Sequence, residues 1–412
     1  MYSSFLKHSV RCQVLLFFCG LVFVFGCVLL VHSGQGRWTA NIRLQNDEVS
    51  QTSIPKQRHD QVSSFRKVDI GNIQINITYL TKLLQYRLAL PNDALKFNHR
   101  SPCKEHANDS QPCLKENCPD LSNKSLQERI EELVLAPHFQ LEHHQLQNIL
   151  SVVSDVSESD VIIVSASSSN HFKEMQAMFK ALHRTVYPVL KNFNVILFDI
   201  GLKKKQRRLT EKYCKCQVLS FPFKQFPTHV RELLCYSWKA IIIRALVTKA
   251  RKLLIWQDTS IRWTEEFPSV FQRAMKYGQQ LIESTHGARI TSHTHPQMFA
   301  YMREEACQYF PYREIQCGFQ VMKNDPLVIQ AILNPWTRCA LEEPCICPVY
   351  PKSVIRCSKG LSSTLPRCHR FDQSAMSIIL SKLYAADRYR FMVPEYSTSN
   401  PKFQRYSGNP II

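Results

Sequence analysis

The stretch KLLIWQDTSIRW, residues 252–263, gives the clearest indication of the fold, because an apolar run that predicts a buried strand is followed closely by an acid. Leu253–Trp256 form an unbroken apolar run, which is typical of a strand buried on both faces of a sheet. Asp258 follows this run. In open α/β sheets, ligands bind outside the carboxyl ends of the strands. Asp258 is therefore either an ordinary turn residue or part of a binding site.

The segments before this stretch alternate between strand and helix patterns. Short apolar or β-branched runs predict strands over 160–167 (DVIIVSAS), 194–201 (NVILFDIG) and 216–221 (CQVLSF). Apolar residues at helical spacing predict helices over 125–150, 171–190, 203–214 and 231–250. Short connections between alternating elements predict an α/β fold with a mostly parallel sheet covered by helices on both faces. Asp199 ends a predicted strand as Asp258 does.

The amino end carries a stretch that fits a membrane span. VLLFFCGLVFVFGCVLLV, residues 14–31, has no charge and is long enough to cross a hydrocarbon core of about 30 Å. Basic residues precede it, so the positive-inside rule predicts a single-pass type II protein whose body faces the lumen. The alternative is a cleaved signal peptide. We predict a cytosolic tail (1–12), a transmembrane signal anchor (13–31), a lumenal stem (32–125) and an α/β domain (126–412).

Two further features agree with a lumenal body in the Golgi or endoplasmic reticulum. Sequons at Asn76, Asn108 and Asn123 could accept glycans only there. The 16 cysteines suit disulfides in an oxidising compartment. Five of them lie with one histidine in residues 339–373, where zinc is the alternative to disulfides. A lumenal address does not fit nucleic-acid binding.

Charge gives a weaker indication of partners. The formal net charge is +19, and GLKKKQRRL, residues 201–209, holds five basic residues. This run is either a solvated helix face or a surface that attracts an acidic acceptor, such as a sulfated glycan, or an anionic membrane.

Residues 161–409 resemble the nucleotide-sugar-dependent glycosyltransferases of the A-type fold, most closely the retaining, glycogenin-like branch. The first strand and helix are similar to the nucleotide-binding start of that family. YSWKAIIIRALVTKARKLLIWQDTS places Arg244 in a helix before the strand that carries the family's Asp-X-Asp motif. IQCGFQVMKND offers Gly318, and RFDQSAMSIIL offers Asp372 and Gln373. The resemblance implies transfer of a sugar from a nucleotide sugar to a glycan or glycoprotein acceptor.

The resemblance also implies roles for particular residues. Catalysis falls to Asp372 and Gln373, although Asp372 also fits a helix N-cap. The residues implied to bind the nucleotide sugar are Ser165, Arg244, Asp258, Ser260 and Gly318. The metal ligands would be Asp258 and Ser260, holding manganese or another divalent cation.

The sequence departs from the family's metal motif. Ser260 stands where the family has a second acid, and hard cations prefer charged oxygen ligands. The tail after residue 404 has no histidine to complete the site. His286, His293 and His295 could compensate, or they are simply exposed loop residues.

Two other functions are alternatives, and the sequence agrees with the first of them only. A binding or adhesion protein that kept the transferase fold and lost its metal site agrees with the incomplete motif at Asp258. A membrane-anchored sulfotransferase would need a glycine-rich or basic phosphate loop after the first strand. The loop SASSSNHF, residues 165–172, has neither glycine nor lysine.

Overall fold

The computed structural model describes residues 76–91, 118–263, 267–283, 289–349, 368–393 and the backbone of 403–405. The chain divides into residues 1–45 and 46–412, and all described residues belong to the second unit. The predicted cytosolic tail and transmembrane anchor, Asn108 and His286 lie outside the described residues. No helix in the described ranges is long and apolar enough to span a membrane.

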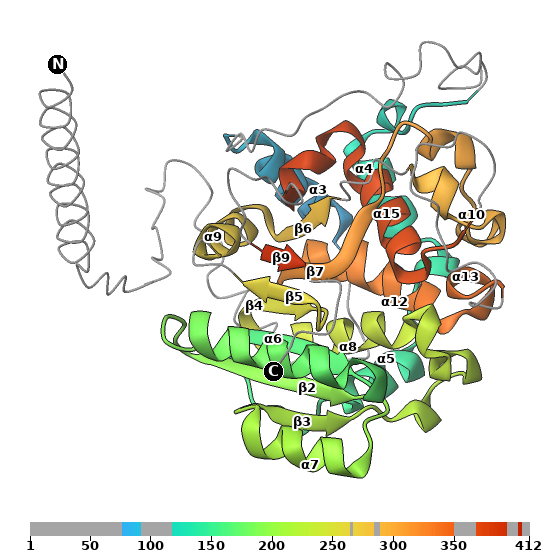
Figure 1. The fold of residues 1–412 in the computed structure, drawn as a ribbon. Helices are drawn as coiled ribbons and strands as arrows, with labels where there is room; N and C mark the ends of the chain where they lie inside the picture. Colours follow the sequence, from blue (N-terminus) through green and yellow to red (C-terminus); the bar gives the residue numbers. More distant parts are fainter. Residues whose placement is uncertain are drawn as a thin grey trace, which may run out of the picture. The chain divides into compact units, whose positions relative to one another are not determined.

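A sheet forms the centre of the domain (Figure 1). It has seven strands in the order β3-β2-β1-β4-β7-β6-β8. Its strands are β1 (Ser159–Ser167), β2 (Phe193–Asp199), β3 (Gln217–Ser220), β4 (Ala250–Gln257), β6 (Gln279–Glu283), β7 (Ile315–Lys323) and β8 (Met392–Val393). A separate pair joins β5 (Ile261–Trp263) to β9 (Phe403–Arg405). The strands predicted over 160–167, 194–201 and 216–221, and the one that opens residues 252–263, are all present.

The prediction of a mostly parallel sheet is confirmed, with one strand that makes it mixed. β1 pairs in parallel with β2 and β4, and β2 pairs in parallel with β3. β7 lies antiparallel between β4 and β6, and β6 is parallel to β8. The pairing of β4 with β7 brings the backbone of Gly318 against the end of β4.

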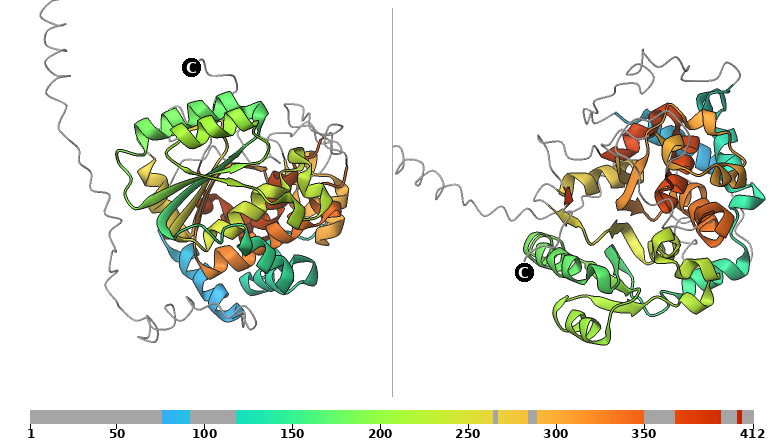
Figure 2. Two further views of the ribbon diagram at one scale, coloured as in Figure 1. Left: turned by 90° about the horizontal axis from the view of Figure 1, so that it is seen from below. Right: turned by 45° about the vertical axis from the view of Figure 1, so that its right-hand side comes forward.

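Helices cover both faces of the sheet, as the sequence predicts (Figure 2). The α-helices are α3 (Ile77–Ala89), α4 (Leu126–Val134), α5 (His143–Ser151), α6 (Phe172–Thr185), α7 (Lys204–Tyr213), α8 (Ser237–Val247), α9 (Pro268–Tyr277), α10 (Pro296–Met302), α11 (Pro326–Val328), α12 (Asn334–Leu341), α13 (Glu343–Ile346) and α15 (Phe371–Tyr384). α6 and α9 pack on one face, in a cluster that includes Ile255. α8, α12 and α15 pack on the other, in a cluster that includes Trp256.

The amphipathic pattern of α6 explains its position. Its buried residues Met175, Met178, Phe179 and Leu182 follow helical spacing and form one apolar stripe against the sheet. The helix predicted over 125–150 is instead two helices, α4 and α5. Pro137 begins the short turn between them, because proline cannot continue a helix.

Helix α3 lies inside the range assigned to the stem, yet it packs on the domain. Leu80 and Leu84 belong to its core, and the Arg87 guanidinium forms a buried ion pair with Asp325 at the start of α11. Asn76 caps α3 by accepting a hydrogen bond from the Tyr79 backbone. The folded domain therefore includes residues 76–91, while the division of the whole chain stays a prediction.

Four disulfides stabilise the described part of the domain. They are Cys118–Cys307, Cys214–Cys216, Cys235–Cys347 and Cys339–Cys345. Cys368 is also disulfide-bonded. The prediction that the cysteines of residues 339–373 form disulfides is thus confirmed for the four that the structure describes there, of which Cys347 pairs with Cys235 outside this range. The free cysteine of the described residues is the buried Cys317.

Candidate functional site

The strand order reverses between β1 and β4, so the sheet has a topological switch point at the carboxyl ends of these two strands. β2 and β3 extend the sheet on one side of β1, whereas β4 lies on the other side. The connections after β1 and β4 therefore diverge at this point, which is where open α/β sheets bind ligands. Asp258 follows β4 directly, and its backbone N–H donates to Gly318 O over 2.7 Å.

A buried lysine joins the two acids that the sequence singles out. The Lys239 Nζ atom lies 3.3 Å from Asp258 Oδ1 and 2.9 Å from Asp372 Oδ2. It also lies 3.5 Å from the Cys317 carbonyl oxygen. Lys239 stands in the first turn of α8 and Asp372 in the first turn of α15. Three distant segments of the chain therefore meet at one ammonium group.

The surroundings of Lys239 are aromatic. Its ammonium lies 5.0 Å from the ring centre of Tyr236 and 5.5 Å from that of Trp256, within the range of cation–π attraction. Trp336 Nε1 donates to the backbone carbonyl of Asp372 over 2.9 Å. Only 4% of the Lys239 side chain is exposed, against 27% for Asp258. Asp258 is thus the member of the ion-paired group that a ligand can reach.

Backbone strain flanks the same group. Tyr236, before α8, has φ 56°, and Phe371, before Asp372, has φ 44°. Bulky side chains disfavour this left-handed region, and such residues cluster at functional sites. The two strained aromatic residues are neighbours, with ring centres 6.4 Å apart. The strained residues therefore lie at the starts of α8 and α15, next to Lys239 and Asp372.

Burial and charge act in opposite directions on the ion-paired group. Burial on its own would lower the pKa of Lys239, but the charges of Asp258 and Asp372 outweigh it, and the pKa lies above its ordinary value. Burial raises the pKa of Asp372, and the Lys239 charge opposes that rise. Lys239 is therefore a permanent ammonium.

A second polar group lies beside Asp258, in the loop that follows β1. His171 Nδ1 lies 3.0 Å from Glu174 Oε2, and the same oxygen accepts from Thr259 Oγ1 over 2.8 Å. The hydrogen bond to Glu174, and then the charges of Glu174 and Asp258, raise the pKa of His171. Glu174 thereby links the loop after β1 to the turn after Asp258.

The structure brings together three of the predicted site residues around Lys239: Asp258, Gly318 and Asp372. Gln373 follows Asp372 at the start of α15, and its Oε1 accepts from the Arg370 guanidinium over 3.4 Å. Asp372 stands in the first turn of α15 and is not its N-cap, a position that Arg370 holds.

Two predicted residues lie away from this group. Arg244 is buried further along α8, where its Nε donates to Asn334 Oδ1 over 2.6 Å. Ser165 is buried in β1. Residues two apart in a strand point to the same face, so Ser165 shares its face with Ile163, which packs in the cluster of α6 and α9. By the same spacing, Asp258 shares the opposite face with Trp256. The Ser165 and Asp258 side chains are thus directed to different faces.

Other acids and histidines of interest have local structural roles. Asp199 Oδ1 accepts hydrogen bonds from the backbone N–H groups of Gly201 and Leu202, so Asp199 stabilises the turn that follows β2. His293 Nδ1 lies 2.9 Å from Glu314 Oε2. His295 caps α10.

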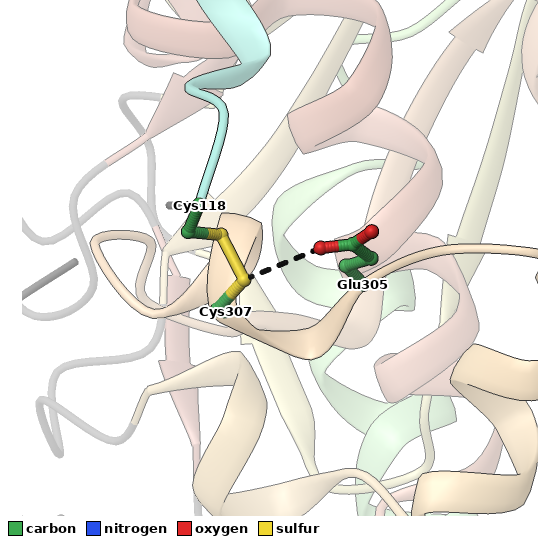
Figure 3. Close-up of side chains that lie close together, drawn as sticks. All are labelled: Cys118, Glu305 and Cys307. Atoms are coloured by element: carbon green, nitrogen blue, oxygen red, sulfur yellow. Dashed lines mark hydrogen bonds between the residues drawn. A yellow bond between two sulfur atoms is a disulfide. The ribbon is translucent and has the colours of Figure 1, made fainter. Parts of the chain in front are cut away.

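The residues at Asp258 do not fit a divalent cation. The Ser260 hydroxyl is buried, and its oxygen has no hydrogen-bond partner among the described residues, but a neutral hydroxyl is a poor replacement for a carboxylate. Within the described ranges, the group of three acid, histidine or cysteine side chains close enough to share an ion is Cys118, Glu305 and Cys307. Its two sulfurs form a disulfide, so they are not thiolate ligands (Figure 3).

Sequence reasoning missed Lys239 and His171. The signal for Lys239 is a lone lysine in the apolar helix SWKAIIIRALV, since lysine is almost never fully buried without a partner. The signal for His171 is its spacing of three residues from Glu174 at the start of a helix.

Comparison with known families and proteins gives limited matches. Residues 123–244 match a family described as a protein of unknown function, DUF1647. The matched segment runs from before α4 to within α8 and ends before Asp258. No curated protein sequence matches the chain significantly.

Several solved structures are similar in part. Core-mannan synthase A (CmsA/Ktr4) from Aspergillus fumigatus, in an Mn/GDP form, has a TM-score of 0.34 at 11% identity and covers 57% of this chain and 72% of its own. The mannosyltransferase Ktr4p from S. cerevisiae has a TM-score of 0.30 at 8% identity, covering 55% and 76%. Mouse xyloside xylosyltransferase 1 has a TM-score of 0.31 at 9% identity, covering 58% and 85%. Each likeness concerns the fold alone.

Proposed function

We propose that the protein is a glycosyltransferase that moves a sugar from a nucleotide sugar to a glycan or glycoprotein acceptor. One observation carries the proposal: Asp258, from the end of β4, and Asp372, from the start of α15, meet at the topological switch point of the sheet. The family resemblance assigns roles to these same two acids, and in the folded protein both form ion pairs with the Lys239 ammonium.

Transfer of a sugar from a nucleotide sugar needs few side chains, because the substrate carries its own leaving group. The bond between the anomeric carbon and the nucleoside diphosphate breaks, the acceptor hydroxyl forms a new bond to that carbon, and its proton is released. The protein must stabilise positive charge on the sugar and negative charge on the diphosphate. The family resemblance assigns the first task to the Asp372 carboxylate and the Gln373 amide oxygen, and both residues are buried in the structure.

Two basic residues near Asp258 and Asp372 could stabilise the negative charge on the diphosphate. Arg370 precedes Asp372, is partly buried, and acts electrostatically on it. His171 interacts electrostatically with Asp258, and 62% of its side chain is exposed. A diphosphate between these residues would lie near the Arg370 guanidinium and near His171, whose pKa is raised by its hydrogen bond to Glu174.

The test is a panel of nucleotide sugars offered to the purified protein in manganese and in EDTA. A ligand that binds the folded state raises its apparent stability, so thermal unfolding identifies the donor. Release of nucleoside diphosphate then reports turnover. If no nucleotide sugar shifts the unfolding temperature in either condition, the proposed function is wrong.

A non-catalytic binding protein is the second candidate, and the Lys239 ion pairs favour it. An ammonium that already neutralises two carboxylates can serve the fold rather than a reaction. This candidate predicts ligand binding without release of nucleoside diphosphate at any acceptor tested.

The proposed location is the membrane of the Golgi or endoplasmic reticulum, with the domain in the lumen. Disulfides are typical of oxidising compartments. Asn76 and Asn123 are exposed, as glycan acceptors must be. Protease treatment of intact microsomes tests this, since a lumenal domain is protected until detergent is added. Digestion without detergent would contradict the orientation.

A further inference from the structure

The position beside Asp258 is already filled by a positive group that belongs to the chain. Lys239 lies within ion-pair distance of both Asp258 and Asp372, and its side chain is buried. A divalent cation bound to the Asp258 carboxylate would lie close to this ammonium and be repelled by it. The lysine and a metal ion therefore compete for one place.

The hydrogen bonds of Lys239 show what the ammonium does. It has three N–H donors, and three oxygens lie around it: one each from Asp258, Asp372 and the Cys317 carbonyl. No donor is left for a ligand. Lys239 acts through the two carboxylates, so it is a positioning residue.

A purely structural lysine offers a comparison within the same domain. Lys382, in α15, is buried between Glu132 and Glu304 much as Lys239 is buried between its two acids. Lys382 does not lie at the end of a central strand, and its acids are not those of the motif. Lys239 differs because it stands at the switch point of the sheet, between the strained residues Tyr236 and Phe371.

We infer that Lys239 replaces the divalent cation, so that the site binds the diphosphate of its donor without a metal ion. The inference rests on the proposed function. The ammonium holds Asp258 and Asp372 in place, and the exposed His171 and the partly buried Arg370 supply the charge for the diphosphate. No metal ligand is then required where Ser260 replaces the second acid.

Binding of UDP and GDP to the full-length protein tests the inference. Isothermal titration in EDTA and in manganese chloride should give the same affinity for the nucleotide that binds. If the nucleotide binds only with manganese, the inference is wrong while the proposed function stands. If neither nucleotide binds in either condition, both are wrong.

Substitution of Lys239 provides a second test of the inference. Lys239→Ala leaves two neighbouring carboxylates without their cation, so nucleotide affinity in EDTA should fall by more than about tenfold. Manganese should restore it, and electron paramagnetic resonance should detect manganese bound to the variant but not to the wild type. Manganese bound at this site in the wild-type protein would overturn the inference.

Two controls separate this effect from loss of folding. Lys382→Ala removes an equally buried lysine and should lower stability without changing the response of nucleotide binding to manganese. Lys239→Arg keeps the charge and should keep binding in EDTA. If Lys239→Ala does not fold, Lys239→Arg still decides the matter, because a need for manganese in that folded variant contradicts the inference.

Discussion

The Lys239 ammonium lies 2.9 Å from the Asp372 carboxylate and connects the first turn of α8 to the first turn of α15. The contact is buried, so water does not compensate either charge when its partner is removed. Removal of one partner from such a pair typically costs more than the pair itself contributes. Stability therefore reports directly on the candidate site.

Asp372→Asn should destabilise the protein by about 3 kcal/mol, because Lys239 then keeps only Asp258 as a charged partner. Urea unfolding of the variant and the wild type measures the difference. Gln373→Ala is the control, since Gln373 is equally buried but leaves no charge unpaired. Equal stability of Asp372→Asn and the wild type would mean that Asp372 is not ionised in the folded protein.

Protonation of His171 should be visible in a titration. Its pKa is raised, first by the hydrogen bond to Glu174, so its midpoint in the folded protein should lie above the usual value of about 6.5. The charged interaction is fully present below about 6.5 and is lost as the pH rises through the folded pKa. Nucleotide affinity should weaken over the same interval, because a cation that faces the diphosphate disappears.

Nuclear magnetic resonance of the histidine ring protons measures this midpoint. Glu174→Gln should lower the midpoint more than Asp258→Asn does, because the hydrogen bond outweighs the distant charge. A wild-type midpoint at or below about 6.5 would contradict the geometry of the loop.

The sequence predicted the fold in its main features and the site in part. The apolar run before Asp258 and the β-branched run over 160–167 identify buried strands, since few other structures bury so many consecutive apolar residues. The direction of β7 could not be predicted, because the spacing of apolar residues is the same in parallel and antiparallel strands. Asp372 could be placed beside Asp258 only through the order of motifs, since three segments far apart in the chain build the site.

Helix α3 illustrates another limit of sequence reasoning. It lies in a region whose sequence is otherwise mostly polar, and its role depends on Asp325, a partner far away in the chain. A chain that begins at residue 118 should be less stable than one that begins at residue 46. It loses the burial of Leu80 and Leu84, about 1.5–3 kcal/mol each, and leaves Asp325 unpaired.

Single substitutions make the same test without truncation. Leu84→Ala should cost about 2–5 kcal/mol because Leu84 is fully buried. Tyr79→Ala, on the exposed face of the same helix, should change stability by no more than about 0.5 kcal/mol. Equal effects of the two substitutions would show that α3 does not pack on the domain in solution.

Asp258 and Asp199 form a matched pair for the last prediction, because each acid stands at the carboxyl end of a parallel strand. Asp199 accepts two backbone hydrogen bonds and pairs with Arg207, so all these partners come from its own turn and the helix that follows. Asp258 instead pairs with Lys239 on another helix, and it is partly exposed. Asp199→Asn should therefore cost about 1 kcal/mol and leave nucleotide binding unchanged, since asparagine serves the same turn. Asp258→Asn should change nucleotide affinity, in EDTA as well as in manganese, while the protein stays folded, because it alters the charge of the group that Lys239 forms with the two acids. Thermal unfolding and nucleotide titration of both variants check the contrast, and unchanged affinity in Asp258→Asn would remove this acid from the site.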